Sequence, residues 1–153
     1  MPSKKILLTT LFVSLLSTNT FADLLTKDNL NSIKGNWHLR VLDGHDVKKA
    51  RAIIDFHSQK MFIDGFDSCN RFSGYLKVKA QNTFYSKLKS SRMACRQNIH
   101  QYTSQRMKTT IEEGFTITEE SRYGIDGITL KSKSHNLFFK KMGGTGSILD
   151  IIK

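Results

Sequence analysis

The chain has 153 residues, with 24 lysines and arginines against 13 acidic residues, so its formal net charge at pH 7 is +11. This length allows one domain with a buried core and leaves little room for a second. A charge of this sign and size suits a polyanionic partner, although bases that are spread along a chain, as here, can also serve only to solvate its surface.

Residues 1–22 have the pattern of a secretory signal peptide. Two lysines precede an apolar run at residues 6–16, and small residues lead up to Ala22, so we expect cleavage between Ala22 and Asp23. A membrane anchor is the alternative, but a span needs about 20 apolar residues and this run is well short of that. We therefore predict a protein of the periplasm or a secreted one, at most peripheral to a membrane, and no nucleic-acid partner.

Most of the mature domain, residues 23–142, is predicted to form antiparallel β-sheet. Residues 23–34 have the spacing of a short helix, but after them lysines alternate with apolar residues, which is typical of strands with one solvated face. Trp37, Leu39 and Val41 form the apolar face of the first strand. We expect strands at residues 36–42, 51–56, 60–64, 75–80, 83–89, 115–118, 127–131 and 137–140.

A single main helix is predicted over residues 97–113. Apolar residues there follow helical spacing without an interrupting glycine or proline, and Gly114 provides a stop signal. Strands before and after one helix indicate an α+β fold. Beyond residue 142, glycines lead into a C-terminal tail, residues 143–153, which we expect to be mobile.

The chain has two cysteines, Cys69 and Cys95. In an exported protein we expect them to form a disulfide. For a loop of this length, the chain-entropy relation gives a stabilisation of the folded state of about 3.5 kcal/mol. The alternative is a reactive or redox thiol, but the sequence has no Cys-x-x-Cys motif. The crosslink would bring Arg71 near Arg92 as an anion-binding pair, unless each arginine pairs with a local carboxylate such as Asp67.

Motifs for catalysis, metal binding or cofactor binding are not found in the sequence. The five histidines are scattered without zinc-site spacings, and there is no nucleophile elbow, phosphate loop or dinucleotide fingerprint. We therefore predict no enzyme activity, no metal and no cofactor. An enzyme is a third hypothesis on one ground, the clustering of Asp67, Ser73 and two arginines near the crosslink.

Two segments in this order resemble the signature of the META/HslJ domain family: Cys69-Asn70-Arg71-Phe72-Ser73-Gly74 and Ser91-Arg92-Met93-Ala94-Cys95. Gly35-Asn36-Trp37 is similar to the family's opening strand. The resemblance implies a strongly curved antiparallel β-sheet, a partial barrel, packed against one main α-helix and similar in shape to lipid-binding pilot proteins of type III secretion. It also implies an envelope protein associated with stress tolerance or virulence, and it assigns no catalytic residues.

We predict an exported, non-enzymatic META-like domain, a stress-tolerance or virulence-associated factor that binds an apolar or anionic envelope component such as lipid or lipopolysaccharide. The alternative is a protein-interaction module that acts as a chaperone or pilot for an outer-membrane or secretion component. We expect a monomer. The candidate binding residues are those of the two motifs: Asn70, Arg71, Phe72, Ser73, Gly74, Arg92 and Met93.

Overall fold

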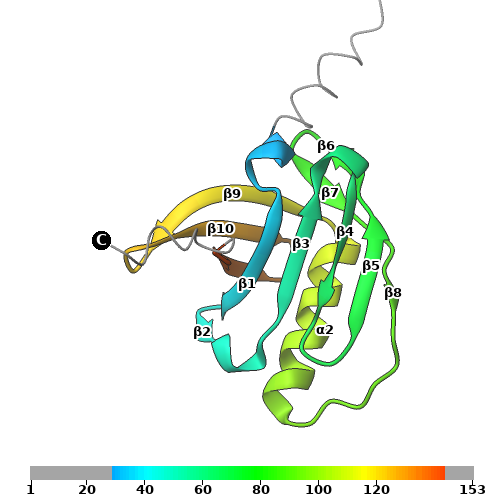
Figure 1. The fold of residues 1–153 in the computed structure, drawn as a ribbon, viewed down its shortest axis with the longest axis vertical. Coiled ribbons are helices and arrows are strands. Elements are labelled where there is room, and N and C mark those ends of the chain that lie inside the picture. Colours follow the sequence, from blue (N-terminus) through cyan, green and yellow to red (C-terminus); the bar gives the residue numbers. More distant parts are fainter. Residues whose placement is uncertain (1–28, 144–153) are drawn as a thin grey trace, which may run out of the picture.

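A computed structural model describes residues 29–143 of the chain. In it, a strongly curled antiparallel sheet forms a half-barrel, and one main helix, α2 (Asn98–Glu113), packs against it (Figure 1). The predicted α+β fold class is therefore confirmed. The predicted signal peptide, its cleavage site at Ala22 and Asp23, and nearly all of the predicted tail lie outside the described residues.

The sheet has eleven strands in the order β6-β7-β9-β10-β11-β1-β3-β4-β5-β8, with β2 added beside β1. A helical turn at residues 29–32 precedes β1, and two short 3-10 turns, η1 (Lys48–Ala50) and η2 (Ser58–Lys60), connect early strands. The strands are β1 (Gly35–Leu42), β2 (His45–Asp46), β3 (Ile53–His57), β4 (Phe62–Phe66), β5 (Arg71–Tyr75), β6 (Lys77–Ala80), β7 (Thr83–Tyr85), β8 (Lys89–Ser90), β9 (Phe115–Arg122), β10 (Ile125–Ser132) and β11 (Asn136–Lys141).

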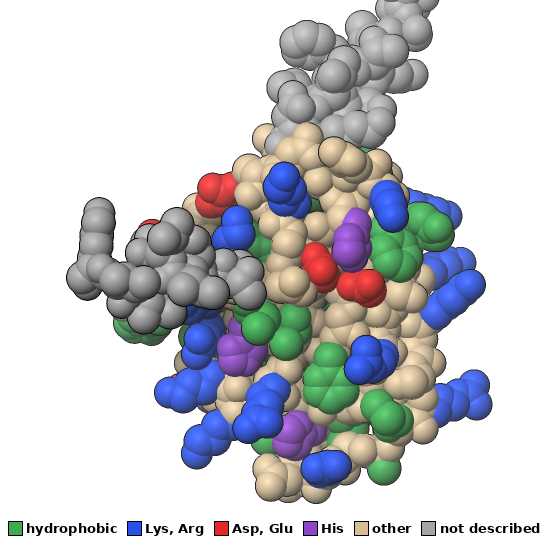
Figure 2. All heavy atoms as spheres, in the orientation of Figure 1, with side chains coloured by type: hydrophobic (Ala, Val, Ile, Leu, Met, Phe, Trp, Pro, Cys, Tyr) green, Lys and Arg blue, Asp and Glu red, His purple; other side chains and the backbone are tan. Residues whose placement is uncertain are grey.

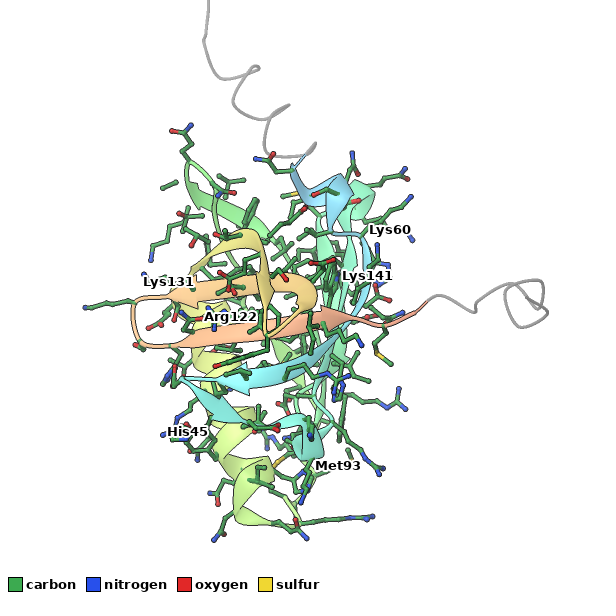
Figure 3. All side chains as sticks on the ribbon, turned by 90° about the vertical axis from the view of Figure 1, so that its left-hand side faces the viewer. His45, Lys60, Met93, Arg122, Lys131 and Lys141 are labelled. Carbon is green, nitrogen blue, oxygen red and sulfur yellow. A yellow bond between two sulfur atoms is a disulfide. The ribbon has the colours of Figure 1, made fainter. Side chains whose placement is uncertain are left out.

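The sheet bends so that its two parts run in different directions. Strands β1, β3, β4 and β5 follow the long axis of the molecule with α2 behind them, whereas β9, β10 and β11 cross that axis (Figures 1 and 3). Glycines allow neighbouring strands to pack this closely: a Cβ at Gly65 would lie 2.1 Å from the Ile53 carbonyl oxygen, and one at Gly127 would lie 2.1 Å from that of Phe139.

A β-bulge in β1 changes which side chains of that strand enter the core. Trp37 and Leu39 are buried as predicted. The pairing with β11 then shifts between Leu39 and Val41, so that Leu42 is fully buried and Val41 is only half-buried. The prediction that Val41 shares the buried face is wrong, because an extra residue in one strand reverses the alternation that follows it.

The core lies between the concave face of the sheet and α2. Its largest fully buried members are phenylalanines, among them Phe56, Phe84, Phe115 and Phe139 from four different strands, and the helix adds Met107 and Ile111. Burial of each such side chain contributes about 1.5–3 kcal/mol. The predicted helix is confirmed to within one residue. It ends at Gly114, whose φ of +108° is one that glycine adopts without strain.

The carboxylate of Glu113 fastens the end of α2 to the turn between β10 and β11. It accepts hydrogen bonds from the Ser134 amide at 2.9 Å, from the Ser134 hydroxyl at 2.8 Å and from the Ser132 hydroxyl. Partial burial opposes ionisation, but these hydrogen bonds together lower the pKa of Glu113 below its ordinary value. A negative charge near a helix C-terminus interacts unfavourably with the helix dipole. Here the hydrogen bonds from Ser132 and Ser134 offset that unfavourable interaction.

Two predicted strands are interrupted in the structure. The strand expected at residues 75–80 divides at Leu76, whose amide donates to the Met61 carbonyl, and Val78 beyond it is exposed. The strand expected at residues 83–89 stops at Tyr85, because the next amide donates to the end of α2 instead of to a neighbouring strand. Among residues 29–143, no helix has the length and apolar character needed to cross a membrane.

Candidate functional site

The two motifs singled out in the sequence are joined by the predicted disulfide. Cys69 and Cys95 are bonded, with their Cα atoms 4.9 Å apart, and neither cysteine of the chain is left as a free thiol. The bond connects the turn after β4 to the segment that leads into α2. Because both sulfurs are used in this link, the structure supports the structural role over the reactive-thiol alternative.

The turn before β5 is held by the Asp67 side chain. One Asp67 carboxylate oxygen accepts the backbone amides of Cys69 at 2.9 Å and Asn70 at 2.7 Å, which is the pattern of an Asx turn. Ser68 has a φ of +92°, and its hydroxyl lies 2.6 Å from Nδ1 of His100 in the first turn of α2. The turn is therefore fixed to both the sheet and the helix.

Asn70 connects the two motifs directly. Its side-chain oxygen accepts the backbone amide of Met93 at 2.7 Å and the hydroxyl of Ser91 at 3.2 Å. The Ser91 hydroxyl in turn accepts the Arg71 amide at 3.1 Å. Together with the disulfide, these bonds hold the segment after β8 beside β5, so Asn70 positions the site through its hydrogen bonds.

A groove of about 1,030 Å³ lies beside this junction on the outer face of the sheet. Cross-strand pairing places Ile53, Phe66 and Arg71 next to one another on that face. Met93, which is 52% exposed, lies at its edge. The full lining is Ile53, Asp64, Gly65, Phe66, Arg71, Phe72, Ser73, Lys89, Ser90, Ser91 and Met93. In Figure 2, apolar and basic side chains are intermixed on this face.

The predicted site residues separate into groove residues and supporting residues. Arg71, Ser73 and Met93 line the groove, and Phe72 borders it while packing mainly in the core at 4% exposure. Gly74 is buried, and a Cβ there would lie 2.2 Å from the Ser86 hydroxyl, so it permits close packing. Arg92 is exposed and does not line the groove.

The alternative that these arginines are neutralised by Asp67 is not supported. The Asp67 carboxylate accepts backbone amides, as described above, and within residues 29–143 neither Arg71 nor Arg92 forms an ion pair. Arg71 therefore presents its charge to the groove. Lys89, paired across from Ser73 in the β5–β8 ladder, adds a second cation there.

Sequence reasoning missed several groove residues that lie outside the two motifs. Ile53, Phe66 and Lys89 reach the groove only through strand pairing, and no local pattern connects them. One signal was present: Ile53 and Ile54 are adjacent in a strand, so one of the two had to face away from the core. Ile54 is fully buried, which leaves Ile53 on the outer face.

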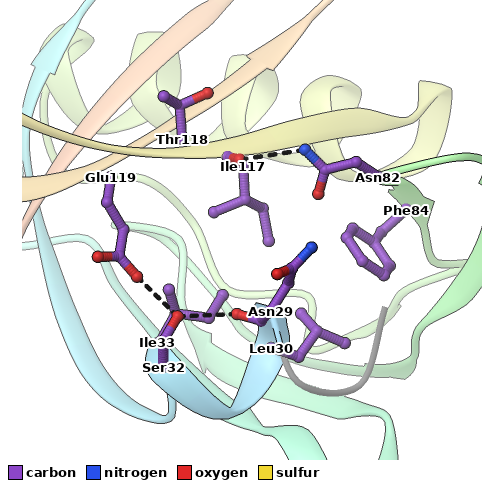
Figure 4. A pocket seen from close by; sticks show the side chains of 9 residues that line it. All are labelled: Asn29, Leu30, Ser32, Ile33, Asn82, Phe84, Ile117, Thr118 and Glu119. Atoms are coloured by element: carbon purple, nitrogen blue, oxygen red, sulfur yellow. Dashed lines mark hydrogen bonds between the residues drawn. The ribbon is translucent and has the colours of Figure 1, made fainter. Parts of the chain in front are cut away.

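A second hollow, of about 360 Å³, lies between the helical turn at residues 29–32 and the start of β9 (Figure 4). It is lined in part by Leu30, Phe84 and Ile117, and at its edge the Ser32 hydroxyl donates to Glu119 at 2.6 Å. No predicted site residue borders it, and its one charged side chain is acidic. The groove beside the disulfide is thus the better match to an anionic ligand.

Comparison with known proteins places this fold in a known group. The META domain profile matches residues 28–143. An NMR structure of a protein from Burkholderia xenovorans is similar with a TM-score of 0.55 at 16% identity, covering 77% of this chain and 89% of that one. A second NMR structure gives a TM-score of 0.56 at 23% identity, covering 78% and 92%. At these identities the structures share the fold. No curated protein matches the sequence.

Proposed function

The chain belongs to the META domain family, and we propose that it is an exported, non-enzymatic envelope or secreted domain that binds an anionic amphiphile in the groove beside its disulfide. The observation that carries the proposal is one concave surface that combines an apolar floor with two cations, Arg71 and Lys89, which form no ion pair within residues 29–143. A lipid or lipopolysaccharide presents this chemistry, an acyl chain joined to a negatively charged headgroup. A role in stress tolerance or virulence would follow from holding such a component.

The floor of the groove suits an acyl chain. Ile53 and Phe66 lie directly opposite one another in the β3–β4 ladder, and both are half-buried where a solvated sheet face would normally be polar. Met93 adds a flexible apolar side chain at the edge, and methionine adapts readily to ligands of variable shape.

The headgroup would lie at the end of the groove that carries Arg71 and Lys89. Arg71 is directly opposite Phe66 in the β4–β5 ladder, so a guanidinium lies next to the apolar floor. Guanidinium groups bind phosphate and carboxylate through two parallel hydrogen bonds. Asp64 also borders the groove and would repel an anion, which sets the orientation of the ligand along it.

Two further features support the proposal. The disulfide between Cys69 and Cys95 suggests a non-cytoplasmic location, because reducing compartments keep such thiols free.

The hydrogen bond between Ser68 and His100 has the short distance of a catalytic serine–histidine pair. However, Ser68 is only 6% exposed, and neither residue lines the groove. This contact holds the motif turn against α2, in accord with a non-enzymatic role.

Lysolipids test the proposal, because they are monomeric at low concentration. Calorimetry should show binding of lysophosphatidylglycerol, or of lipid A, and much weaker binding of lysophosphatidylcholine with the same acyl chain. The double variant Arg71→Glu/Lys89→Glu should lose at least about tenfold in affinity, which corresponds to about 1.4 kcal/mol. The matched control Lys108→Glu/Lys131→Glu makes the same change in net charge at exposed positions outside the groove. Equal affinity of the two double variants would refute the proposal.

An exposed sheet edge favours the chaperone or pilot alternative. Strand β6 ends the sheet, and all four of its residues, Lys77–Ala80, are exposed. Such an edge can accept a strand from a partner protein. A Val78→Pro variant would block this pairing with no loss of core packing, since Val78 is 45% exposed. If crosslinked envelopes yield the same partners with and without this substitution, the edge is not the docking surface.

A further inference from the structure

Three side chains of types that bind metals, two of which lie outside the groove and one of which borders it, lie together on the outer face of the sheet. Asp55 and His57 are two residues apart on β3, so they share one face, and Asp64 lies directly opposite Asp55 on β4. Figure 2 shows two acidic side chains and a histidine gathered in the middle of this face. The three ligand atoms all lie within 4.8 Å of one another.

The spacing of these atoms is that of ligands around one ion. Nε2 of His57 lies 3.4 Å from Oδ1 of Asp64 and 3.8 Å from Oδ2 of Asp55. The His57–Asp64 contact is a long hydrogen bond, and both separations exceed the roughly 2.7–3.2 Å of a good one. For a tetrahedral zinc ion with ligand bonds of about 2.0–2.1 Å, two ligand atoms are separated by about 3.3–3.4 Å. The His57–Asp64 separation matches this value, and the 3.8 Å contact with Asp55 would have to shorten to place all three around such an ion.

The charges of the group also call for a cation. Two carboxylates directly opposite one another in a ladder repel, and such pairs are destabilising. In a protein with an excess of lysine and arginine one of those bases would be expected to neutralise them, yet among residues 29–143 neither Asp55 nor Asp64 has an ion pair with a lysine or arginine. The side chain that both of them contact is His57.

The group is accessible and rigidly supported. The side chains of Asp55, His57 and Asp64 are 22%, 38% and 48% exposed. A hollow of about 510 Å³ borders Asp55 and His57, and the groove borders Asp64, so water or a further ligand can reach an ion from either side. The His57 ring packs at 5.7 Å from the ring of Phe62, which limits its rotation. Ligands held on paired strands are better positioned than ligands on loops.

We propose that Asp55, His57 and Asp64 bind a zinc ion with water in the remaining position. An imidazole together with carboxylates favours zinc over magnesium or calcium, which prefer oxygen ligands alone. Lys34 and Lys60 line the neighbouring hollow and weaken the local attraction for a cation, but they leave the ligand set intact. The sequence predicted no metal because its histidines are scattered. Two of these ligands come from one strand and the third from its neighbour, so only strand pairing joins them.

Calorimetric titration of the metal-free protein with Zn²⁺ tests this site, with Co²⁺ absorption as a second probe of a site of low coordination number. We expect one equivalent to bind. Asp55→Asn and His57→Gln should each weaken binding by at least about tenfold while leaving lysolipid affinity unchanged, because neither residue lines the groove. Circular dichroism verifies that each variant is folded. If one of the two variants does not fold, the other still tests the site.

The controls change the same residue types at exposed positions elsewhere: His45→Gln on β2 and Asp126→Asn on β10. They should bind Zn²⁺ as the wild-type protein does. The proposal is overturned if the wild-type protein binds no Zn²⁺. It is also overturned if the control variants lose as much affinity as Asp55→Asn and His57→Gln, which would indicate general adsorption to surface side chains.

Discussion

Removal of the disulfide should destabilise the domain mainly through the unfolded state. Cys69 and Cys95 are separated by 26 positions, and the chain-entropy relation for a loop of that size gives about 3.5 kcal/mol. The native geometry does not depend on the bond alone, because the Asn70 side chain also holds Met93 and the Asp67 carboxylate holds the turn. The double variant Cys69→Ala/Cys95→Ala should therefore remain folded, with a melting temperature lower by roughly 10–20 °C.

Urea unfolding of the mature domain measures this change. The free energy of unfolding should fall by about 3.5 kcal/mol, and the denaturant dependence should rise because the uncrosslinked chain exposes more surface when unfolded. A reducing agent should shift the wild-type protein by a similar amount and leave the variant unchanged, which separates the loss of the bond from the loss of sulfur packing. A loss below about 1 kcal/mol, or a wild-type protein indifferent to reductant, would refute the reasoning.

Two further predictions concern the bulge and the end of the helix. Leu42→Ala should cost about 2–5 kcal/mol in the free energy of unfolding, whereas Val41→Ala should cost about 1 kcal/mol or less; similar losses would contradict the bulge in β1. Because the folded-state pKa of Glu113 lies below its unfolded value, its stabilising contribution is present above the unfolded pKa and is lost as pH falls through the folded one. Glu113→Gln should flatten the acid limb of a stability profile measured by urea unfolding, and an unchanged limb would rule out this carboxylate as a contributor.

Local patterns were sufficient to predict the main helix and the disulfide. The helix has a clear period and a glycine stop at Gly114, and the pair of cysteines allowed only one intramolecular pairing. These features depend on residues near one another in sequence or on simple counting. They therefore needed no knowledge of how the strands are arranged.

Features that depend on strand register could not be predicted in this way. The bulge near Arg40 leaves no mark in the alternation of β1, and the interruption at Leu76 arises from a hydrogen bond to Met61 in a different strand. The same limit applies to the site. The motif residues were identified, but the apolar floor they border comes from Ile53 and Phe66, which reach it only through pairing of β3, β4 and β5.

The pairing of β1 with β11 has a consequence for how the chain matures. Trp37 is opposite Lys141, about a hundred residues later, so the sheet cannot be completed until almost the whole polypeptide is available. Contacts between such distant positions slow folding, because a large loop must close before they form. A slowly folding chain stays unfolded for longer after synthesis, and an unfolded chain is the form that the proposed export through a narrow translocation channel requires.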